Sequence, residues 1–194
     1  MSNKEEKGNQ SQKILDAAFR CISAKGYANV SLRDVAEEAG VVLSQLNYYY
    51  KNKEGLFSEV IKALKQEYLA SIERNLKEGI TVKEKVAFLI EFSQKIFLEK
   101  TELSRMLFDF LSMAVWCEPY REQLQAIFDE LAELLGKYVS NEISANAKLN
   151  QFSVKEISRM LLAAIFGIGM QYVIEPENKD IFKSLNMINV LIES

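Results

Sequence analysis

The sequence predicts an all-α fold, and three observations support this. Apolar residues recur three and four positions apart in successive stretches, which is the spacing of one helix face. Only 2 of the 194 residues are prolines and 48% are hydrophobic, a composition typical of a folded chain rather than a disordered one. No stretch alternates apolar and polar residues as a half-buried strand does. From these patterns we expect about nine helices.

The first helix is expected to follow a flexible polar tail at residues 1–10, which lacks the apolar core of a signal peptide. Its apolar residues lie about one turn apart, and Lys25-Gly26 then forms a typical helix end. These apolar residues are Ile14, Leu15, Ala18, Phe19 and Ile22. They predict a helix with one buried face.

Residues 32–51, LRDVAEEAGVVLSQLNYYYK, have the pattern of a helix-turn-helix. Ser31 with Asp34 three positions later is a typical helix start, because both side chains can satisfy free backbone donors. Gly40 supplies the reversal between the two helices. The second helix, expected over residues 42–50, is short and polar, which suits the major groove of DNA.

The rest of the chain indicates further amphipathic helices. A long helix with apolar positions between Leu56 and Leu76 is expected to connect the helix-turn-helix to the remainder. Later helices are expected at about 82–99, 102–116, 119–143, 153–175 and 180–192. We therefore divide the chain into a tail (1–10), a DNA-binding domain (11–56) and a C-terminal domain (57–194).

The segment from Met160 to Ile174 has no charged residue and is apolar on nearly every side. It is too short for a bilayer, which needs roughly twenty apolar residues, so no membrane contact is expected. A second copy of the chain would cover its outer side; the alternative is an ordinary buried helix in a monomer. The predicted dimer interface comprises Leu162, Ile165, Gly167, Gly169, Tyr172, Phe182, Leu185, Ile188 and Leu191.

The motifs ILDAAFRCISAKGY, SLRDVAEEAGV and LNYYYKNKEGLF, at their spacing, resemble the TetR family of bacterial transcriptional regulators over residues 10–60. The resemblance implies a three-helix DNA-binding domain, joined by a long helix to a C-terminal bundle for ligand binding and dimerisation. It further implies a repressor that binds a palindromic operator as a homodimer and is released by a small molecule. The residues that it places on DNA are Ser31 or Arg33, Gln45, Tyr48, Tyr49 and Lys53.

Side-chain chemistry suits these DNA contacts. Gln45 can pair with an adenine edge and Arg33 with a guanine edge. Phosphate contacts are expected from Ser44, Tyr48, Tyr49, Lys51 and Lys53. The net charge of −3 is unevenly spread, since residues 1–53 hold eight Lys or Arg against six Asp or Glu. A modest basic side is sufficient if a dimer doubles it.

Three positions depart from the usual family pattern. Val42 and Leu43 stand where serine and lysine are common, and Asn47 stands where tyrosine is common. We hypothesise that Val42 or Leu43 contacts a thymine methyl and that Asn47 contacts a base edge or a phosphate. Alternatively, Leu43 packs inside the domain. Tyr50 is expected to be structural.

Aromatic residues are concentrated in the C-terminal part, where thirteen of the twenty follow Gly79. They can line an apolar cavity for a small hydrophobic effector, although such residues also simply fill cores. The predicted lining comprises Phe88, Phe92, Met106, Phe108, Phe110, Met113, Trp116, Phe128 and Phe166. We expect this unknown effector and no other cofactor.

An enzyme is not expected. The sequence has no histidine, which excludes a Ser-His-Asp or Cys-His arrangement and an imidazole-held metal. Cys21 and Cys117 are far apart and form no CxxC pair, so neither a metal site nor export is indicated and the cytoplasm is the expected setting. The remaining alternative is a helical ligand-binding or scaffold protein without specific DNA binding, which would show no salt-sensitive affinity for DNA.

Overall fold

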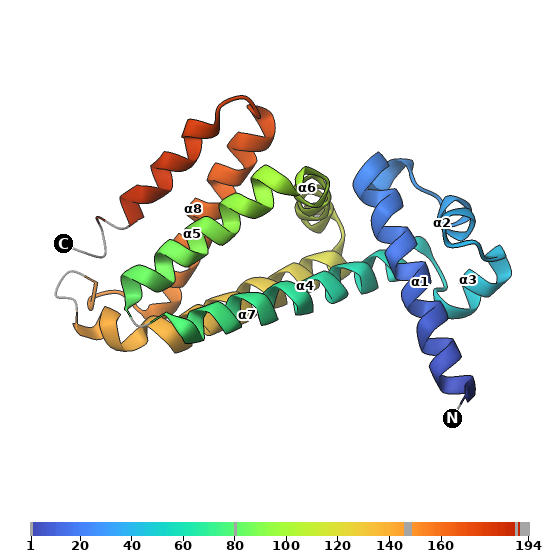
Figure 1. The fold of residues 1–194 in the computed structure, drawn as a ribbon, viewed down its shortest axis with the longest axis horizontal. Coiled ribbons are helices and arrows are strands. Elements are labelled where there is room, and N and C mark those ends of the chain that lie inside the picture. The colour runs from blue at the N-terminus through green and yellow to red at the C-terminus, as the bar shows by residue number, and fades with distance from the viewer. Residues whose placement is uncertain (1, 80, 146–148, 189, 191–194) are drawn as a thin grey trace.

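The structure, a computed structural model, describes residues 2–79, 81–145, 149–188 and 190. Over these ranges the chain forms eight α-helices and two 3-10 segments and contains no strand, so the predicted all-α fold class is confirmed. Helices α1 to α3 form a small head at one end of the molecule, and α4 to α8 form a larger body beside it (Figure 1).

The head consists of α1 (Ser2–Lys25), α2 (Leu32–Ala39) and α3 (Leu43–Tyr49), with the 3-10 turn η1 (Tyr27–Asn29) after α1. Each helix turns its apolar residues toward one core. Ile14 of α1, Val35 of α2 and Leu46 of α3 are at most 1% exposed. This shared core holds the two helices of the helix-turn-helix against α1.

Helix α1 begins at Ser2, so residues 2–10 are helical where a flexible tail was expected at residues 1–10. Residues 2–10 contain no proline. Once a helix has nucleated, each further residue adds a hydrogen bond at little extra cost. The helix anchored at the buried Ile14 therefore extends toward the N-terminus.

Helix α4 (Lys53–Glu78) joins the head to the body as one continuous element and lies alongside α7 (Glu118–Ala145) (Figure 1). Its start is capped by Asn52, whose side chain accepts a hydrogen bond from the Gly55 amide at 2.8 Å. Near this end Phe57 is buried in the head core, and near the other end Leu76 is buried in the body. A displacement of α4 therefore moves both parts.

The body is completed by α5 (Val82–Glu99), α6 (Thr101–Trp116), α8 (Val154–Ile174) and the 3-10 segment η2 (Lys179–Asn186). Helix α8 packs against α5, α6, α7 and η2. Where α5 and α8 cross, the ring of Phe97 lies directly on the backbone of Gly169. A Cβ at Gly169 would lie 2.1 Å from that ring, so a side chain at this position requires Phe97 to move.

One apolar cluster continues from the head into α6 and α7. The rings of Tyr27 and Phe57 are 4.8 Å apart, and Phe57 also meets Phe110 of α6 at 6.1 Å and Tyr120 of α7 at 5.7 Å. The predicted boundary between the DNA-binding and C-terminal domains, at residue 56, therefore falls within a shared apolar core. The division into separate domains stays a prediction.

The last expected helix, at 180–192, differs from the prediction. Residues 179–186 form the 3-10 segment η2, and residues 191 and 192 lie outside the described residues. Phe182, Leu185 and Ile188 recur every three residues and are all buried. Because a 3-10 helix has three residues per turn, this spacing puts Phe182 and Leu185 on one face of η2, and Ile188 lies just beyond its end.

Candidate nucleic-acid interface and effector cavity

The geometry of the helix-turn-helix is fixed by backbone contacts around Ser31 and Gly40. The Ser31 hydroxyl accepts a hydrogen bond from the Asp34 amide at 3.2 Å, and the Asp34 carboxylate accepts one from the Ser31 amide at 2.7 Å. The Ser31 hydroxyl also donates a hydrogen bond to the Asp34 carboxylate, and this bond, followed by that from the Ser31 amide, holds the pKa of Asp34 below its ordinary value. Gly40 has φ 62°, a left-handed conformation that glycine adopts without strain. The turn therefore sets the direction in which α3 follows α2.

Helix α3 is anchored on its inner side and exposed on its outer side. Leu46 is fully buried, and the hydroxyl groups of Tyr50 and Ser11 are hydrogen-bonded at 2.8 Å. Tyr50 is 8% exposed, as its expected structural role requires, and burial raises the pKa of its hydroxyl. The outer side of α3 is left for a partner.

The predicted DNA-contacting residues fall into an exposed and a half-buried group. The exposed residues are Ser31, Arg33, Val42, Ser44, Gln45, Asn47, Tyr48 and Lys51. The half-buried residues are Leu43, Tyr49 and Lys53. Leu43 packs against the head core, as in the alternative that keeps it inside the domain. Val42, in contrast, is 66% exposed. The Lys53 amine lies 4.1 Å from the centre of the Tyr27 ring, and partial burial lowers its pKa.

The body contains an apolar cavity of about 190 Å³, bounded by α4, α5, α6, α7 and α8. Five of the nine predicted lining residues lie on it, namely Phe92, Met106, Phe110, Phe128 and Phe166. Sequence reasoning missed the contribution of α4, including Leu64, Tyr68 and Ile72. The spacing of apolar residues along α4 predicts that these side chains face inward. It does not indicate whether they line a cavity or fill a packed core.

Four predicted lining residues lie elsewhere. Phe108 stacks on Phe97, with ring centres 6.2 Å apart, in the cluster beneath α8. Phe88 packs beside Phe92 without reaching the cavity, and Met113 packs against the head core. Trp116, the last residue of α6, is 86% exposed. Aromatic content alone does not separate these positions.

The predicted dimer interface also needs correction. Most of its residues face inward: Leu162, Ile165, Gly169, Tyr172, Phe182, Leu185 and Ile188 are buried within one copy. Leu162 and Ile165 line the cavity. Gly167 is exposed as expected, and Leu191 lies outside the described residues. Because α8 is apolar on nearly every side, the sequence pattern did not separate its buried side from its exposed side.

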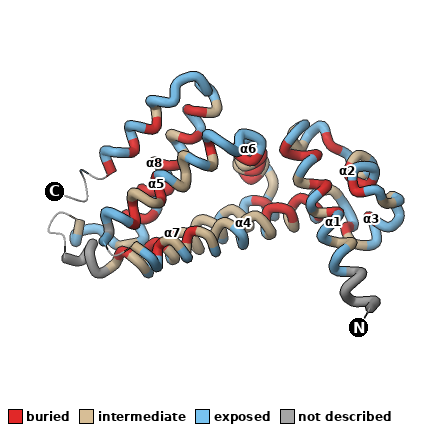
Figure 2. The backbone as a smooth tube through the Cα atoms, viewed as in Figure 1, coloured by how far each residue is buried: buried red, intermediate tan, exposed pale blue. Residues whose placement is uncertain are grey.

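A different set of apolar residues faces outward from α8. The exposed residues are Met160, Ala163, Gly167, Met170 and Ile174. They are spaced three and four apart, as in the seam of paired helices. The exposed Met187 and Val190 follow in the last segment, whose outer side is mostly uncovered (Figure 2). By length and composition the 21-residue helix α8 could also cross a membrane, but such a signal is common in core helices, and its inner side packs on α5 to α7.

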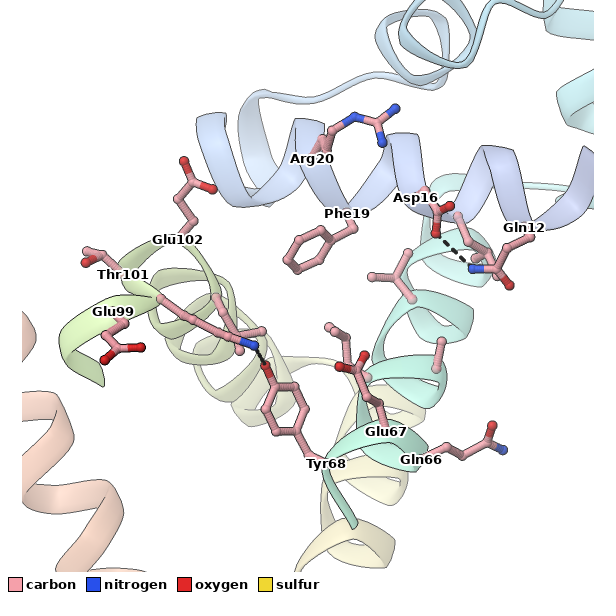
Figure 3. Close-up of a pocket in the computed structure, with 16 residues that line it drawn as sticks. Gln12, Asp16, Phe19, Arg20, Gln66, Glu67, Tyr68, Glu99, Thr101 and Glu102 are labelled. Atoms are coloured by element: carbon pink, nitrogen blue, oxygen red, sulfur yellow. Dashed lines mark hydrogen bonds between the residues drawn. The ribbon is translucent and has the colours of Figure 1, made fainter. Parts of the chain in front are cut away.

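A second hollow, a polar cleft of about 1040 Å³, separates α1 from α4 and from the junction of α5 and α6 (Figure 3). The Phe19 ring of α1 points into it, and Tyr68 of α4 stands opposite. The Lys100 amine donates a hydrogen bond to the Tyr68 hydroxyl at 3.1 Å. The cleft therefore lies between the head and the cavity.

Helix α6 contacts the head on one side and the cavity on another. Its Asp109 carboxylate accepts a hydrogen bond from the Tyr27 amide at 3.0 Å, while Met106 and Phe110 line the cavity. A head with an exposed helix-turn-helix on a helical body with an internal cavity defines the class of helical DNA-binding regulators.

Comparison with known proteins agrees with this class. The family described as bacterial regulatory proteins, tetR family, matches residues 14–60. The fatty acid metabolism regulator protein of Bacillus subtilis is 34% identical over 77 residues, which is 40% of this chain and only 40% of that protein. Residues 14–60 thus match the TetR family of bacterial regulatory proteins, and the relatives that the chain resembles are transcriptional regulators rather than enzymes.

Two solved structures share the whole fold. The TetR transcription regulator of Haloarcula marismortui superposes with a TM-score of 0.80 at 19% identity, covering 95% of this chain and 96% of that one. The regulator FadR of Bacillus subtilis, in complex with stearoyl-CoA, gives a TM-score of 0.77 at 21% identity, covering 93% and 96%. At these identities the likeness is one of fold.

Proposed function

We propose that this chain is a repressor that binds a palindromic operator as a homodimer and leaves it when a small hydrophobic molecule enters the cavity. The observation that carries the proposal is the position of α6. Its Met106 and Phe110 line the cavity, and its Asp109 holds the head at Tyr27. A ligand that displaces α6 therefore changes how the head is held.

Base reading is assigned to the exposed side of α3 and the start of α2. Gln45 pairs with an adenine edge and Arg33 with a guanine edge. Arg33 is favoured over Ser31, because the Ser31 hydroxyl is engaged with Asp34 in the helix cap. Val42 is favoured over the packed Leu43 for a thymine methyl, and Asn47 is a further base or phosphate contact.

Phosphate contacts are assigned to Ser44, Tyr48, Tyr49, Lys51 and Lys53. Between Gly40 and Lys53 the chain has two lysines and no acidic residue, which favours approach to the DNA backbone. Lys53 stands at the start of α4, where free backbone donors also suit a phosphate.

Dimerisation is assigned to the outer side of α8 and the segment that follows. Met160, Gly167 and Ile174 are seven positions apart and exposed, and Gly167 has open space around its Cα that allows close approach. Two copies related by a two-fold axis would present two α3 helices to half-sites about one DNA turn or a multiple apart. Such an arrangement requires a palindromic operator.

The effector site is assigned to the apolar cavity. Its walls come from five helices and are almost entirely aliphatic or aromatic, which suits a hydrophobic molecule. The Bacillus subtilis regulator FadR, which has the same fold, was crystallised with stearoyl-CoA. A protein of the same fold that binds a molecule with a long hydrophobic chain is consistent with a hydrophobic effector.

The test is a selection of bound duplexes from a random pool at two salt concentrations, together with sedimentation of the free protein. We expect a palindrome, a dimer, and an affinity that falls by orders of magnitude as salt rises. A protein that is monomeric and binds no duplex in a salt-sensitive manner would instead be a helical ligand-binding or scaffold protein. Thermal-shift screening of lipophilic compounds, with Leu162→Trp to fill the cavity, tests the effector site.

A further inference from the structure

The apolar cavity and the polar cleft are joined by common walls. Leu64, Tyr68 and Leu103 line both hollows. Tyr68 presents its ring to the cavity side and its hydroxyl to the cleft, where Lys100 binds it (Figure 3). A molecule whose apolar end lies in the cavity would therefore place its other end in the cleft.

The charged side chains that line the cleft are mostly acidic. They are the carboxylates of Asp16, Glu67, Glu99 and Glu102 and the cations of Arg20 and Lys100. The Arg20 guanidinium turns away from Tyr68 and binds Glu38 of α2 at 2.7 Å (Figure 3). Lys100 is therefore the cation at the end where the cleft meets the cavity, and the carboxylates that act on it there are those of Glu67 and Glu99. The local balance is negative.

The Lys100 ammonium shows that this position holds a positive group. Its nitrogen lies 3.1 Å from the Tyr68 hydroxyl oxygen and 5.4 Å from the centre of the Tyr68 ring, within the range of a cation–π contact. The hydrogen bond to Tyr68 raises the pKa of Lys100 above its ordinary value, and Glu67 and Glu99 raise it further. An aromatic ring and two carboxylates thus already stabilise an ammonium at the entrance to the cavity.

We propose that the effector is a cationic amphiphile, with its apolar part in the cavity and an ammonium group at Tyr68, beside or in place of the Lys100 amine. This inference rests on the proposed function, namely that the cavity binds the effector. An anionic head at this entrance would approach Glu67 and Glu99 beside Lys100, while the other lining cations are engaged, Arg20 by Glu38 and Lys65 by Glu130. The chain therefore selects against polyanionic ligands such as an acyl-CoA.

The test uses three probes with the same tail and different heads: octyltrimethylammonium, octanol and octanoate. Binding to the full-length protein is measured by calorimetry at low and high salt, and release of the selected operator by fluorescence anisotropy. Because one exposed charge pair changes affinity by about two- to fivefold, we expect the cation to bind at least about tenfold more tightly than octanoate. This preference should shrink at high salt, because exposed charges are screened.

Two variants test the carboxylates and one tests the lysine. Glu67→Gln and Glu99→Gln should each weaken octyltrimethylammonium about two- to fivefold and leave octanol unchanged. Glu133→Gln, on the exposed side of α7 and outside both hollows, is the matched control and should change neither. Lys100→Met should strengthen binding of the cation, because it removes the competing ammonium.

The opposite results overturn the proposal. If Lys100 and Tyr68 instead form a carboxylate clamp, octanoate will bind best and Lys100→Met will abolish its binding. If all three probes bind equally and release DNA, the cationic assignment is wrong while the effector cavity stands. If no probe binds, and Leu162→Trp changes nothing, the effector cavity itself is wrong and this inference fails with it.

Discussion

The Asp109 carboxylate of α6 accepts a hydrogen bond from the backbone amide of Tyr27, 3.0 Å away, and so connects the body to the head at the turn after α1. The Lys53 amine lies over the ring of Tyr27, and the Tyr27 hydroxyl accepts a hydrogen bond from the Tyr120 hydroxyl at 3.1 Å. Lys53 begins α4, directly after the helix-turn-helix. A short series of contacts thus leads from a cavity-lining helix to the DNA-reading unit.

Asp109→Ala should uncouple the effector from DNA binding. It leaves the Tyr27 amide without its partner, at a cost of about 1–3 kcal/mol in the free energy of unfolding. We expect the probe to bind the cavity as before but to change operator affinity less, as measured by anisotropy with and without the probe. Asp109→Asn keeps an acceptor oxygen and should retain most of the coupling. Full coupling in the alanine variant would show that α6 acts through other contacts.

Gln45→Ala should lower affinity for the selected operator by about 1–3 kcal/mol and relax the preference at one base pair. Lys51→Ala should instead weaken binding to all duplexes similarly, since a phosphate contact carries no sequence information. The slope of log affinity against log salt concentration should become smaller by about one, because one phosphate contact is lost. The two variants are compared by titration against the operator and against a scrambled duplex. An unchanged base preference in Gln45→Ala would remove its base-reading role.

Gly169→Ala should destabilise the body, because overpacking usually costs about 1–3 kcal/mol. The higher helix propensity of alanine returns about 1 kcal/mol and so offsets only part of a typical overpacking cost. Phe97 cannot easily move away, because it is 3% exposed and stacks between Phe108 and Phe182 at 6.2 and 6.3 Å. Thermal unfolding measures the effect.

The controls for Gly169→Ala separate packing from propensity. Gly8→Ala, in α1 with nothing within 4 Å of an added Cβ, should be neutral or slightly stabilising. In a Phe97→Leu background, the cost of Gly169→Ala should shrink, because the smaller side chain leaves room. An equal cost in both backgrounds would contradict the steric explanation.

The sequence predicted the fold class because helical periodicity and capping are local properties. Ser31 with Asp34, and Gly40 with its left-handed backbone, have the roles that their chemistry indicates. The tail and the last helix were less predictable. Residues 2–10 continue a helix that is anchored further along the chain. The three-residue spacing of Phe182 and Leu185 fits a 3-10 segment as well as an α-helix.

The sites were predicted less completely, since burial pattern does not specify the partner of each face. In α8 both sides are apolar, and the sequence alone could not assign Leu162 to the cavity and Met170 to the surface. The cleft depends on Asp16, Tyr68 and Lys100, which come from three separate segments. No local motif brings such residues together, so only the three-dimensional arrangement shows them.

Met170→Glu should prevent dimerisation while leaving the fold of each copy intact. Met170 is 53% exposed, so the carboxylate stays in water in the monomer but would be buried, opposite its own symmetry mate or an apolar surface, in the proposed interface. We expect a monomer by sedimentation, an unchanged helical circular dichroism spectrum, and loss of operator binding. Met187→Glu tests the second part of the interface. Wild-type sedimentation in both variants would place the interface elsewhere.

Acid should loosen the contact between α4 and α7 through Glu73. Its carboxylate lies 3.0 Å from the Lys137 amine, 3.3 Å from that of Lys77 and 3.1 Å from the Tyr138 hydroxyl. These hydrogen bonds, led by that of Lys137, lower the pKa of Glu73 from 4.5 to about 2. A depressed carboxyl pKa contributes stability that is fully present above the unfolded pKa and is lost as pH falls through the folded one. The contribution of Glu73 should therefore disappear between about pH 4.5 and about pH 2.

Glu73→Gln tests this pH dependence, because glutamine keeps the size and does not titrate. Urea unfolding at a series of pH values should show a steeper loss of stability for the wild type than for the variant in that window, and parallel curves above pH 5. Glu133→Gln, an exposed carboxylate on α7, should follow the wild-type curve. Because the Glu73 contacts are at the surface and screened by salt, the difference should also narrow at high ionic strength. Identical curves for Glu73→Gln and the wild type would mean that the Glu73 contacts contribute no measurable stability.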